Sequence, residues 1–142
     1  MQLNPYLQFN GQCEAAFQLY QRCLGGKIEA MMKYADAPPE AQVSPDSRDK
    51  IMHARLVVGD AVLMGSDGGP ERYELPKGFC VSIQIKDPAE AERIFNTLAE
   101  NGQVHMPLQQ TFWAARFGML RDQFGIPWMV NCEGDASERA RA

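Results

Sequence analysis

The chain has 142 residues, a formal net charge of −4 and a pI near 5.2, which predicts one domain with a sizeable core. This acidic balance argues against nucleic acid or an anionic membrane as the partner. No apolar run approaches the roughly 20 residues of a membrane span. The N-terminus lacks the charged and apolar regions of an export signal, so we expect a cytoplasmic protein.

The first half of the chain predicts one helix among four strands. Apolar residues recur at helical spacing from Cys13 to Leu24, and Gly25-Gly26 supplies the positive φ that ends a helix. A loop rich in Pro, Ala and Asp spans 35–47, and loops of this length often carry function. The predicted strands are 3–9, 28–34, 51–58 and 61–65.

The second half repeats this order after a predicted linker at 68–77. Asp87 and Pro88 are typical of a helix start, and Asn101-Gly102 closes the predicted helix. The segment 133–142 is small and charged, and we expect a frayed tail there. The predicted strands are 79–85, 103–109 and the two arms of a hairpin within 112–131.

That hairpin holds both tryptophans and three of the seven phenylalanines of the chain. Alternation puts Phe117, Met119 and Arg121 on one face of the first arm, opposite Arg116. In the second arm, Trp128 shares a face with Ile126 and Val130. Large side chains on both faces require cover on both, or a ligand on one, and the sequence leaves this choice open.

The halves also match in sequence, which suggests an internal duplication. A shift of 76 residues places Glu14-Ala15 on Glu90-Ala91 and Gly26 on Gly102, and it aligns Leu7 with Ile83. In addition, the segment 54–56 echoes 115–117. We therefore predict an α+β fold of two paired βαβββ modules, 1–67 and 78–132, whose sheets enclose a cleft.

Four motifs span residues 1 to about 133. They are Asn4-Pro5-Tyr6-Leu7, Gly11-x-Cys13-Glu14-Ala15-Ala16, Met64-Gly65-Ser66-Asp67, and Phe112-Trp113-x-x-x-Phe117-Gly118-x-x-x-Asp122-x-Phe124-Gly125-x-x-Trp128-x-x-Asn131. These motifs resemble the PhnB-like family of the vicinal oxygen chelate superfamily, which includes glyoxalase I and extradiol dioxygenases. The resemblance implies the glyoxalase/bleomycin resistance/dioxygenase-like fold and a homodimer.

Catalytic members of this superfamily bind a metal through His or Glu on the first and last strands of each half. The matching positions here lie near Pro5, Met64, Cys80 and Met129, none of which is a His or a carboxylate. We therefore expect no metal and no cofactor. Members are often labelled 3-demethylubiquinone 3-methyltransferase, but no Gly-rich turn follows a strand to cradle an adenosyl cofactor. Methyltransferase activity is therefore not expected. Residues beside these positions also make a poor ligand set: Tyr6, Gln8, Asp67, Ser82 and Asn131.

Four cysteines occur without a C-x-x-C pair, and neither histidine stands at ligand spacing from a cysteine pair. A zinc site is therefore not expected. In a reducing compartment the cysteines are interpreted as free thiols, mostly small core residues. They are Cys13, Cys23, Cys80 and Cys132.

Five residues are candidates for ligand binding, each with a structural alternative. His53 is either a general base or anion-binding group, or a half-buried histidine bonded to backbone. Asp67 either accepts a hydrogen bond from substrate or caps the Gly68-Gly69 turn. Trp113 and Trp128 form either an aromatic wall for a flat ligand or part of the core.

Arg116, the fifth candidate, pairs with an anionic ligand, with Asp122, or with a carboxylate across a dimer interface. Asp122 and Asn131 are interpreted as fixing the hairpin turn and the sheet end by local hydrogen bonds. The methionines suggest either an adaptable apolar lining or ordinary core filling. They are Met31, Met32, Met64, Met106, Met119 and Met129.

Three functional hypotheses follow. The first is a binding protein that holds a small, partly aromatic or anionic molecule in the cleft, with the metal ligands lost. The alternative is a metal-dependent lyase, isomerase or dioxygenase of the glyoxalase type. The third is an interaction module whose aromatic hairpin is an interface. The sequence assigns no catalytic residue.

Overall fold

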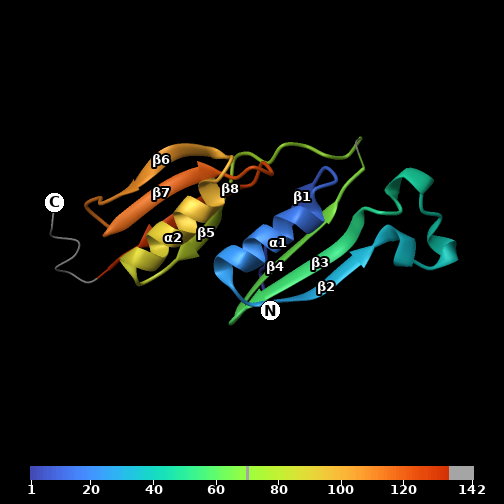
Figure 1. Ribbon diagram of the computed structural model, residues 1–142, viewed down its shortest axis with the longest axis horizontal. Helices are drawn as coiled ribbons and strands as arrows, with labels where there is room; N and C mark the ends of the chain where they lie inside the picture. The colour runs from blue at the N-terminus through green and yellow to red at the C-terminus, as the bar shows by residue number, and fades with distance from the viewer. Residues whose placement is uncertain (70, 135–142) are drawn as a thin grey trace. The chain divides into compact units, whose positions relative to one another are not determined.

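The computed structural model describes residues 1–69 and 71–134, so most of the predicted tail lies outside the described residues. The chain divides into two compact units, Met1–Glu74 and Leu75–Ala142. Each unit consists of one helix lying across one four-stranded sheet (Figure 1). Among the described residues, no helix is long and apolar enough to cross a membrane.

The first unit has the strand order β1-β4-β3-β2. β1 pairs with β4 in parallel, and the other pairs are antiparallel. The predicted loop contains three single-turn 3-10 helices, Tyr34–Asp36, Pro39–Ala41 and Pro45–Ser47. The other elements are β1 (Tyr6–Phe9), α1 (Cys13–Leu24), β2 (Lys27–Lys33), β3 (Ile51–Val58) and β4 (Ala61–Asp67).

The second unit repeats this topology, with the order β5-β8-β7-β6 and β5 parallel to β8. The predicted double βαβββ order and α+β class are therefore confirmed. β4 runs two residues further than predicted, to Asp67, because β1 pairs with it as far as Phe9. The elements are β5 (Val81–Gln84), α2 (Pro88–Ala99), β6 (Gln103–Gln109), β7 (Arg116–Arg121) and β8 (Pro127–Cys132).

Each helix approaches its sheet at a glycine in a strand. A Cβ added at Gly65 in β4 would lie 2.9 Å from Cε1 of Phe17 in α1. A Cβ added at Gly118 in β7 would lie 2.7 Å from Cε2 of Phe95 in α2. Both distances are shorter than real Cβ contacts, so close packing of helix on sheet requires glycine at these positions.

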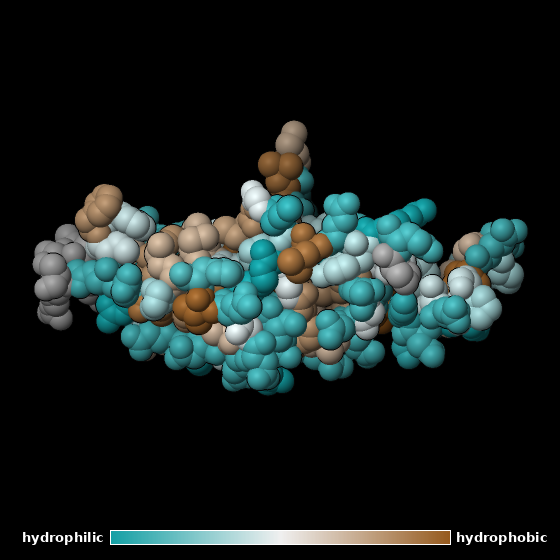
Figure 2. Space-filling model, turned by 90° about the horizontal axis from the view of Figure 1, so that it is seen from above, coloured by the Kyte–Doolittle hydropathy of each residue, from teal (hydrophilic) through white to brown (hydrophobic). Residues whose placement is uncertain are grey.

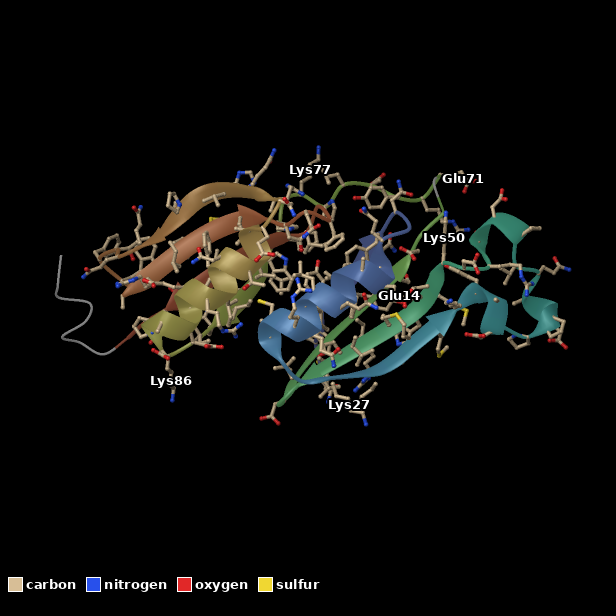
Figure 3. All side chains as sticks on the ribbon, viewed as in Figure 1. Glu14, Lys27, Lys50, Glu71, Lys77 and Lys86 are labelled. Carbon is tan, nitrogen blue, oxygen red and sulfur yellow. The ribbon has the colours of Figure 1, made fainter. Side chains whose placement is uncertain are left out.

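Lysine side chains lie at the periphery of both units. Lys27, Lys77 and Lys86 point away from the ribbon (Figure 3). The cores are aromatic and aliphatic, and in the first unit Phe9, Phe17 and Tyr20 make mutual ring contacts. In each unit, the sheet face that packs against the helix is therefore the face buried from water.

The predicted echo of 54–56 in 115–117 is wrong. In the first sheet Ala54 pairs with Gly65, and in the second Gly118 pairs with Val130. Gly65 and Val130 pair in turn with the matched residues Leu7 and Ile83, so Ala54 corresponds to Gly118. Arg55 thus corresponds to Met119. Arg116 is three residues earlier, an odd number, so its side chain leaves the opposite face of the sheet.

Replacing Gly118 with Ala is expected to lower the free energy of unfolding by about 1–3 kcal/mol, because the added methyl overpacks the contact with Phe95. Urea denaturation followed by circular dichroism measures this. Gly68→Ala is the control: the nearest atom to its added Cβ, Oε1 of Gln8, lies 4.0 Å away, so the change should stay within about 0.5 kcal/mol. Equal losses in both variants would contradict the packing role.

Candidate functional site

The face of the first sheet turned away from α1 carries polar and aromatic side chains. Alternation along the strands puts Leu7, Ala54 and Gly65 on the helix side, where they are buried. Their neighbours on the opposite side are exposed or half-buried. We call this set the open face: Tyr6, Gln8, His53, Arg55, Met64 and Ser66.

Strand pairing brings the open-face residues into rows across the sheet. Met64 pairs with Tyr6 on one side and with Arg55 on the other. Gln8 pairs with Ser66 in the next row. The hydroxyl of Tyr6 lies 3.2 Å from Nδ1 of His53. Their rings stack with centroids 5.9 Å apart and planes 25° apart. His53 therefore hydrogen-bonds to a side chain, where the structural alternative expected backbone.

Arg55 carries a positive charge onto the open face. Its Nε lies 3.3 Å from Oε2 of Glu29, and the two side chains are 38% and 47% exposed. That Nε is buried and makes no hydrogen bond of acceptable geometry. The carboxylate therefore attracts the guanidinium by charge, but it does not accept a hydrogen bond from the Nε–H group. An exposed pair of this kind contributes little to stability. Most donor groups of the guanidinium remain available to a ligand.

Asp67 lies at the end of β4 and is only 2% exposed. Its Oδ1 accepts the backbone N–H of Cys13 at 3.0 Å, and its Oδ2 accepts that of Ile51 at 2.9 Å. The carboxylate therefore joins the first turn of α1 to the start of β3. Asp67 therefore binds the N–H groups of Cys13 and Ile51, and it does not cap the Gly68-Gly69 turn, which was one of the two roles that the sequence suggested.

Trp128 is 1% exposed and lies on the α2 side of β8, opposite Leu120. Its Nε1 donates to Oδ2 of Asp122 at 2.8 Å. Oδ1 of Asp122 accepts the N–H groups of Phe124 and Ile126 at 2.8 and 3.0 Å. The predicted turn-fixing role of Asp122 is confirmed. The indole of Trp128 is a core group whose polar atom is already bonded.

Arg116 lies on the α2 side of its sheet, as the register requires. Its Nε is 3.4 Å from Oε1 of Glu92 on α2, and Nη1 donates to the carbonyl of Ala115 at 2.7 Å. The partner of Arg116 is therefore Glu92, and not Asp122, which was one of three possible partners expected from the sequence. Trp113 is 44% exposed. Its ring makes edge contacts with those of Phe112 and Phe117, with ring centroids 4.7 and 5.2 Å apart.

The five predicted candidates therefore occupy different environments. His53 lies on the open face, Asp67 and Trp128 are buried, Arg116 faces a helix, and Trp113 belongs to an exposed aromatic cluster. Tyr6 was the residue that the sequence interpretation missed. From the sequence, Tyr6 was named only in a motif and among poor metal ligands, because the parallel pairing that brings it near His53 depends on strands far apart in the sequence.

Comparison with known proteins assigns the family. The family model described as 3-demethylubiquinone-9 3-methyltransferase matches residues 1–131. The chain belongs to this family. It is 36% identical to protein YjdN of Escherichia coli strain K12 over 141 residues, covering 92% of this chain and 95% of YjdN.

Solved structures agree with this assignment. Protein PA1353 from Pseudomonas aeruginosa is 54% identical, with a TM-score of 0.88 over 95% of this chain and 99% of that one. A PhnB protein from Bacillus cereus, titled a putative 3-demethylubiquinone-9 3-methyltransferase, is 20% identical with a TM-score of 0.78, covering 93% of this chain and 99% of that one. The predicted PhnB-like resemblance is confirmed.

The superfamily fold is shown by a glyoxylase/bleomycin resistance protein/dioxygenase domain from Frankia sp. EAN1pec. It is 12% identical with a TM-score of 0.63, covering 94% of this chain and 97% of that one. At this identity the likeness shows the fold alone. The predicted glyoxalase/bleomycin resistance/dioxygenase-like fold is confirmed.

The helix-free face of each sheet carries neutral polar groups on its paired parallel strands. Gln8 and Ser66 are paired on β1 and β4, and Gln84 and Asn131 are paired on β5 and β8. Nδ2 of Asn131 donates to Oε1 of Gln84 at 2.8 Å, so these amides bond to each other. Among residues 1–69 and 71–134, no three His, Cys, Asp or Glu side chains gather to hold an ion. Neutral amides and hydroxyls fit a divalent cation poorly.

Cys13, the first residue of α1, is not an activated nucleophile. Cys13 begins α1, a position that often lowers a thiol pKa. Here burial raises the pKa of the Cys13 thiol far above its ordinary value, and the nearby carboxylates of Asp67 and Glu14 raise it further. Cys13, Cys23 and Cys132 are buried and free, as predicted for core residues, and Cys80 is half-buried and free.

The two tryptophans provide a test of the structural roles. Trp128→Phe is expected to lower the free energy of unfolding by about 2–4 kcal/mol, because it removes a hydrogen bond to a buried carboxylate and leaves a cavity. Trp113→Phe, at a half-exposed site, should cost less than about 1 kcal/mol. Urea denaturation followed by far-UV circular dichroism compares them, and a smaller loss for Trp128→Phe would refute its core role.

Proposed function

We propose that this protein binds a small molecule on the open face of its first unit, without a protein-bound metal ion. The observation that carries the proposal is the stacked pair of Tyr6 and His53 beside Arg55 on the sheet face opposite α1. Stacked rings favour a flat group, and a guanidinium favours an anion. The ligand is therefore partly aromatic or anionic.

Methyl transfer, which the family's description names, is not the function we propose. An adenosyl cofactor needs a glycine-rich turn and a helix N-terminus free to bind it. The N-terminus of α1 is bonded by Asp67, and that of α2 by Asp87, whose Oδ1 accepts the N–H of Ala89 at 3.1 Å. In the described part of the chain, both helix N-termini therefore already carry a carboxylate of this protein.

The metal-dependent lyase, isomerase or dioxygenase remains the alternative. It would need metal ligands other than Pro5, Met64, Cys80 and Met129, the residues at the positions that the resemblance matches, because none of these is a His or a carboxylate. We also propose that 1–67 and 78–132 are the two modules, that 68–77 joins them, and that the protein is cytoplasmic, where its free thiols would stay reduced.

Titration of the ¹⁵N-labelled protein with a panel of carboxylates, phosphates, amines and neutral aromatic compounds tests binding. At least one compound should shift the amide signals of Tyr6, His53, Arg55 and Ser66, while those on the solvent side of α1 stay in place. Treatment with EDTA should leave the shifts unchanged. Binding lost on chelation and restored by a divalent ion would support the alternative, and a panel without open-face shifts would refute the proposal.

We further propose a homodimer that uses an exposed aromatic cluster. Figure 2 shows hydrophobic patches separated by hydrophilic surface on the face viewed. In the second unit, Phe112 is 92% exposed and Trp113 is 44% exposed, and burying such side chains favours association.

Sedimentation velocity should give the mass of two chains for the wild type. The double variant Phe112→Ser and Trp113→Ser should shift the protein toward one chain. Val104→Ser removes another exposed apolar side chain, 48% exposed on β6, and should leave the mass unchanged. A wild-type mass of one chain would refute the dimer.

A further inference from the structure

We infer that the ligand of the open face carries an oxyanion, a carboxylate or a phosphate group, held jointly by His53 and Arg55. This inference rests on the proposed small-molecule site and names the chemistry that the site selects. Two N–H donors from neighbouring positions of β3 carry it, one aromatic and one cationic. The body of the ligand would lie against the stacked rings of Tyr6 and His53.

The contact with Tyr6 sets the hydrogen-bonding role of His53. The hydroxyl oxygen of Tyr6 lies 3.2 Å from Nδ1 of His53. A phenol hydroxyl donates well and the unprotonated nitrogen of a neutral imidazole accepts well, so we assign the donor role to Tyr6. The hydrogen of the neutral ring then sits on Nε2. Among the described residues, the contact with Tyr6 is the one hydrogen bond that the imidazole of His53 makes. Nε2–H is thus a donor available to an acceptor group.

Arg55 supplies the charge. In the part of the chain that the structure describes, its guanidinium forms one ion pair, at Nε with Glu29, and that contact lacks hydrogen-bond geometry. A planar carboxylate or a phosphate matches the paired donors of an arginine and forms charge-assisted bonds with them. Glu29 is the opposing group: its negative charge lies 3.3 Å from the guanidinium and competes with any anion that binds there.

The second unit provides an internal contrast. Because Ala54 corresponds to Gly118, Phe117 stands where His53 stands, and Met119 stands where Arg55 stands. Ser82, which the 76-residue shift aligns with Tyr6, completes the comparison. The same scaffold thus carries apolar groups at the positions of His53 and Arg55 in the second unit, so we assign oxyanion recognition to the first unit alone.

Four probes of similar size separate charge from shape: benzoate, phenyl phosphate, benzamide and benzamidine. Titration of the ¹⁵N-labelled protein should show benzoate or phenyl phosphate shifting the open-face amides, with benzamide at least about 10-fold weaker and benzamidine without effect. The stronger of the two anions tells whether the site prefers a carboxylate or a phosphate. Benzamide or benzamidine binding as tightly as both anions would refute the oxyanion class while leaving small-molecule binding intact. Absence of binding by both anions would also refute it.

Substitutions taken from the second unit test the two donors. Arg55→Met and His53→Phe should each weaken binding of the preferred anion by about 10-fold or more. Glu29→Gln should act in the opposite direction and tighten it by about 2- to 3-fold, because the competing charge is removed. The matched control is the pair Arg116→Met and Glu92→Gln, which breaks a similar ion pair on the α2 side and should change nothing. Anion affinity that ignores Arg55→Met and His53→Phe would overturn the assignment.

The tautomer of His53 is a measurement that a merely structural role of Tyr6 would not change. In the neutral ring, ¹⁵N chemical shifts should show hydrogen on Nε2, and Tyr6→Phe should increase the fraction with hydrogen on Nδ1. The same variant should weaken anion binding, while the signals of exposed His105 stay unchanged. A dominant Nδ1–H form in the wild type would contradict the donor role.

Discussion

One helix can cover only one face of a four-stranded sheet, and this constraint governs both halves of the molecule. In each unit the covered face is closed so tightly that a strand glycine is required beneath a phenylalanine of the helix. Residues on the other face are thereby released from packing against the helix. They are free to differ between the halves, and at the positions of His53 and Arg55 they do, since the second unit has Phe117 and Met119 there.

Two buried carboxylates hold the covered sides in place. Asp67 ties the start of α1 to the start of β3, and Asp122 closes the β7–β8 turn and binds the indole of Trp128. Each carboxylate accepts N–H groups on both oxygens, which offsets the cost of burying its charge. Polar groups used in this way within the fold are poor choices for a ligand. Burial therefore moves Asp67 and Trp128 from candidate binding residues to positions that support the scaffold.

The sequence was sufficient for the elements because each has a local signal. Helical spacing predicted both helices, α1 with its observed bounds, and the double βαβββ order followed from turn residues and alternation. Register was not available in the same way. The short echo between 54–56 and 115–117 was misleading, since strand pairing shows that Arg55 and Arg116 leave opposite faces of their sheets.

The candidate site was less predictable than the fold for the same reason. His53 was recognised because it stands alone in a strand pattern, but its partner Tyr6 lies 47 positions away on a strand that reaches it only through β4. Likewise, Glu29 pairs with Arg55 and Glu92 pairs with Arg116 because the two arginines leave opposite faces of their sheets. Side-chain partners across a sheet are set by tertiary pairing, which a single sequence does not display.

The duplication makes the divergence of the two helix-free faces informative. Both units retain a glutamine on the first strand, Gln8 and Gln84, each paired with a small polar residue of the last strand. Where the first unit has His53 and Arg55, however, the second has Phe117 and Met119. Stability does not demand the polar choice, because the same topology folds with apolar groups at these positions. A cation and an imidazole on the sheet face opposite α1 therefore support the proposed ligand site of the first unit.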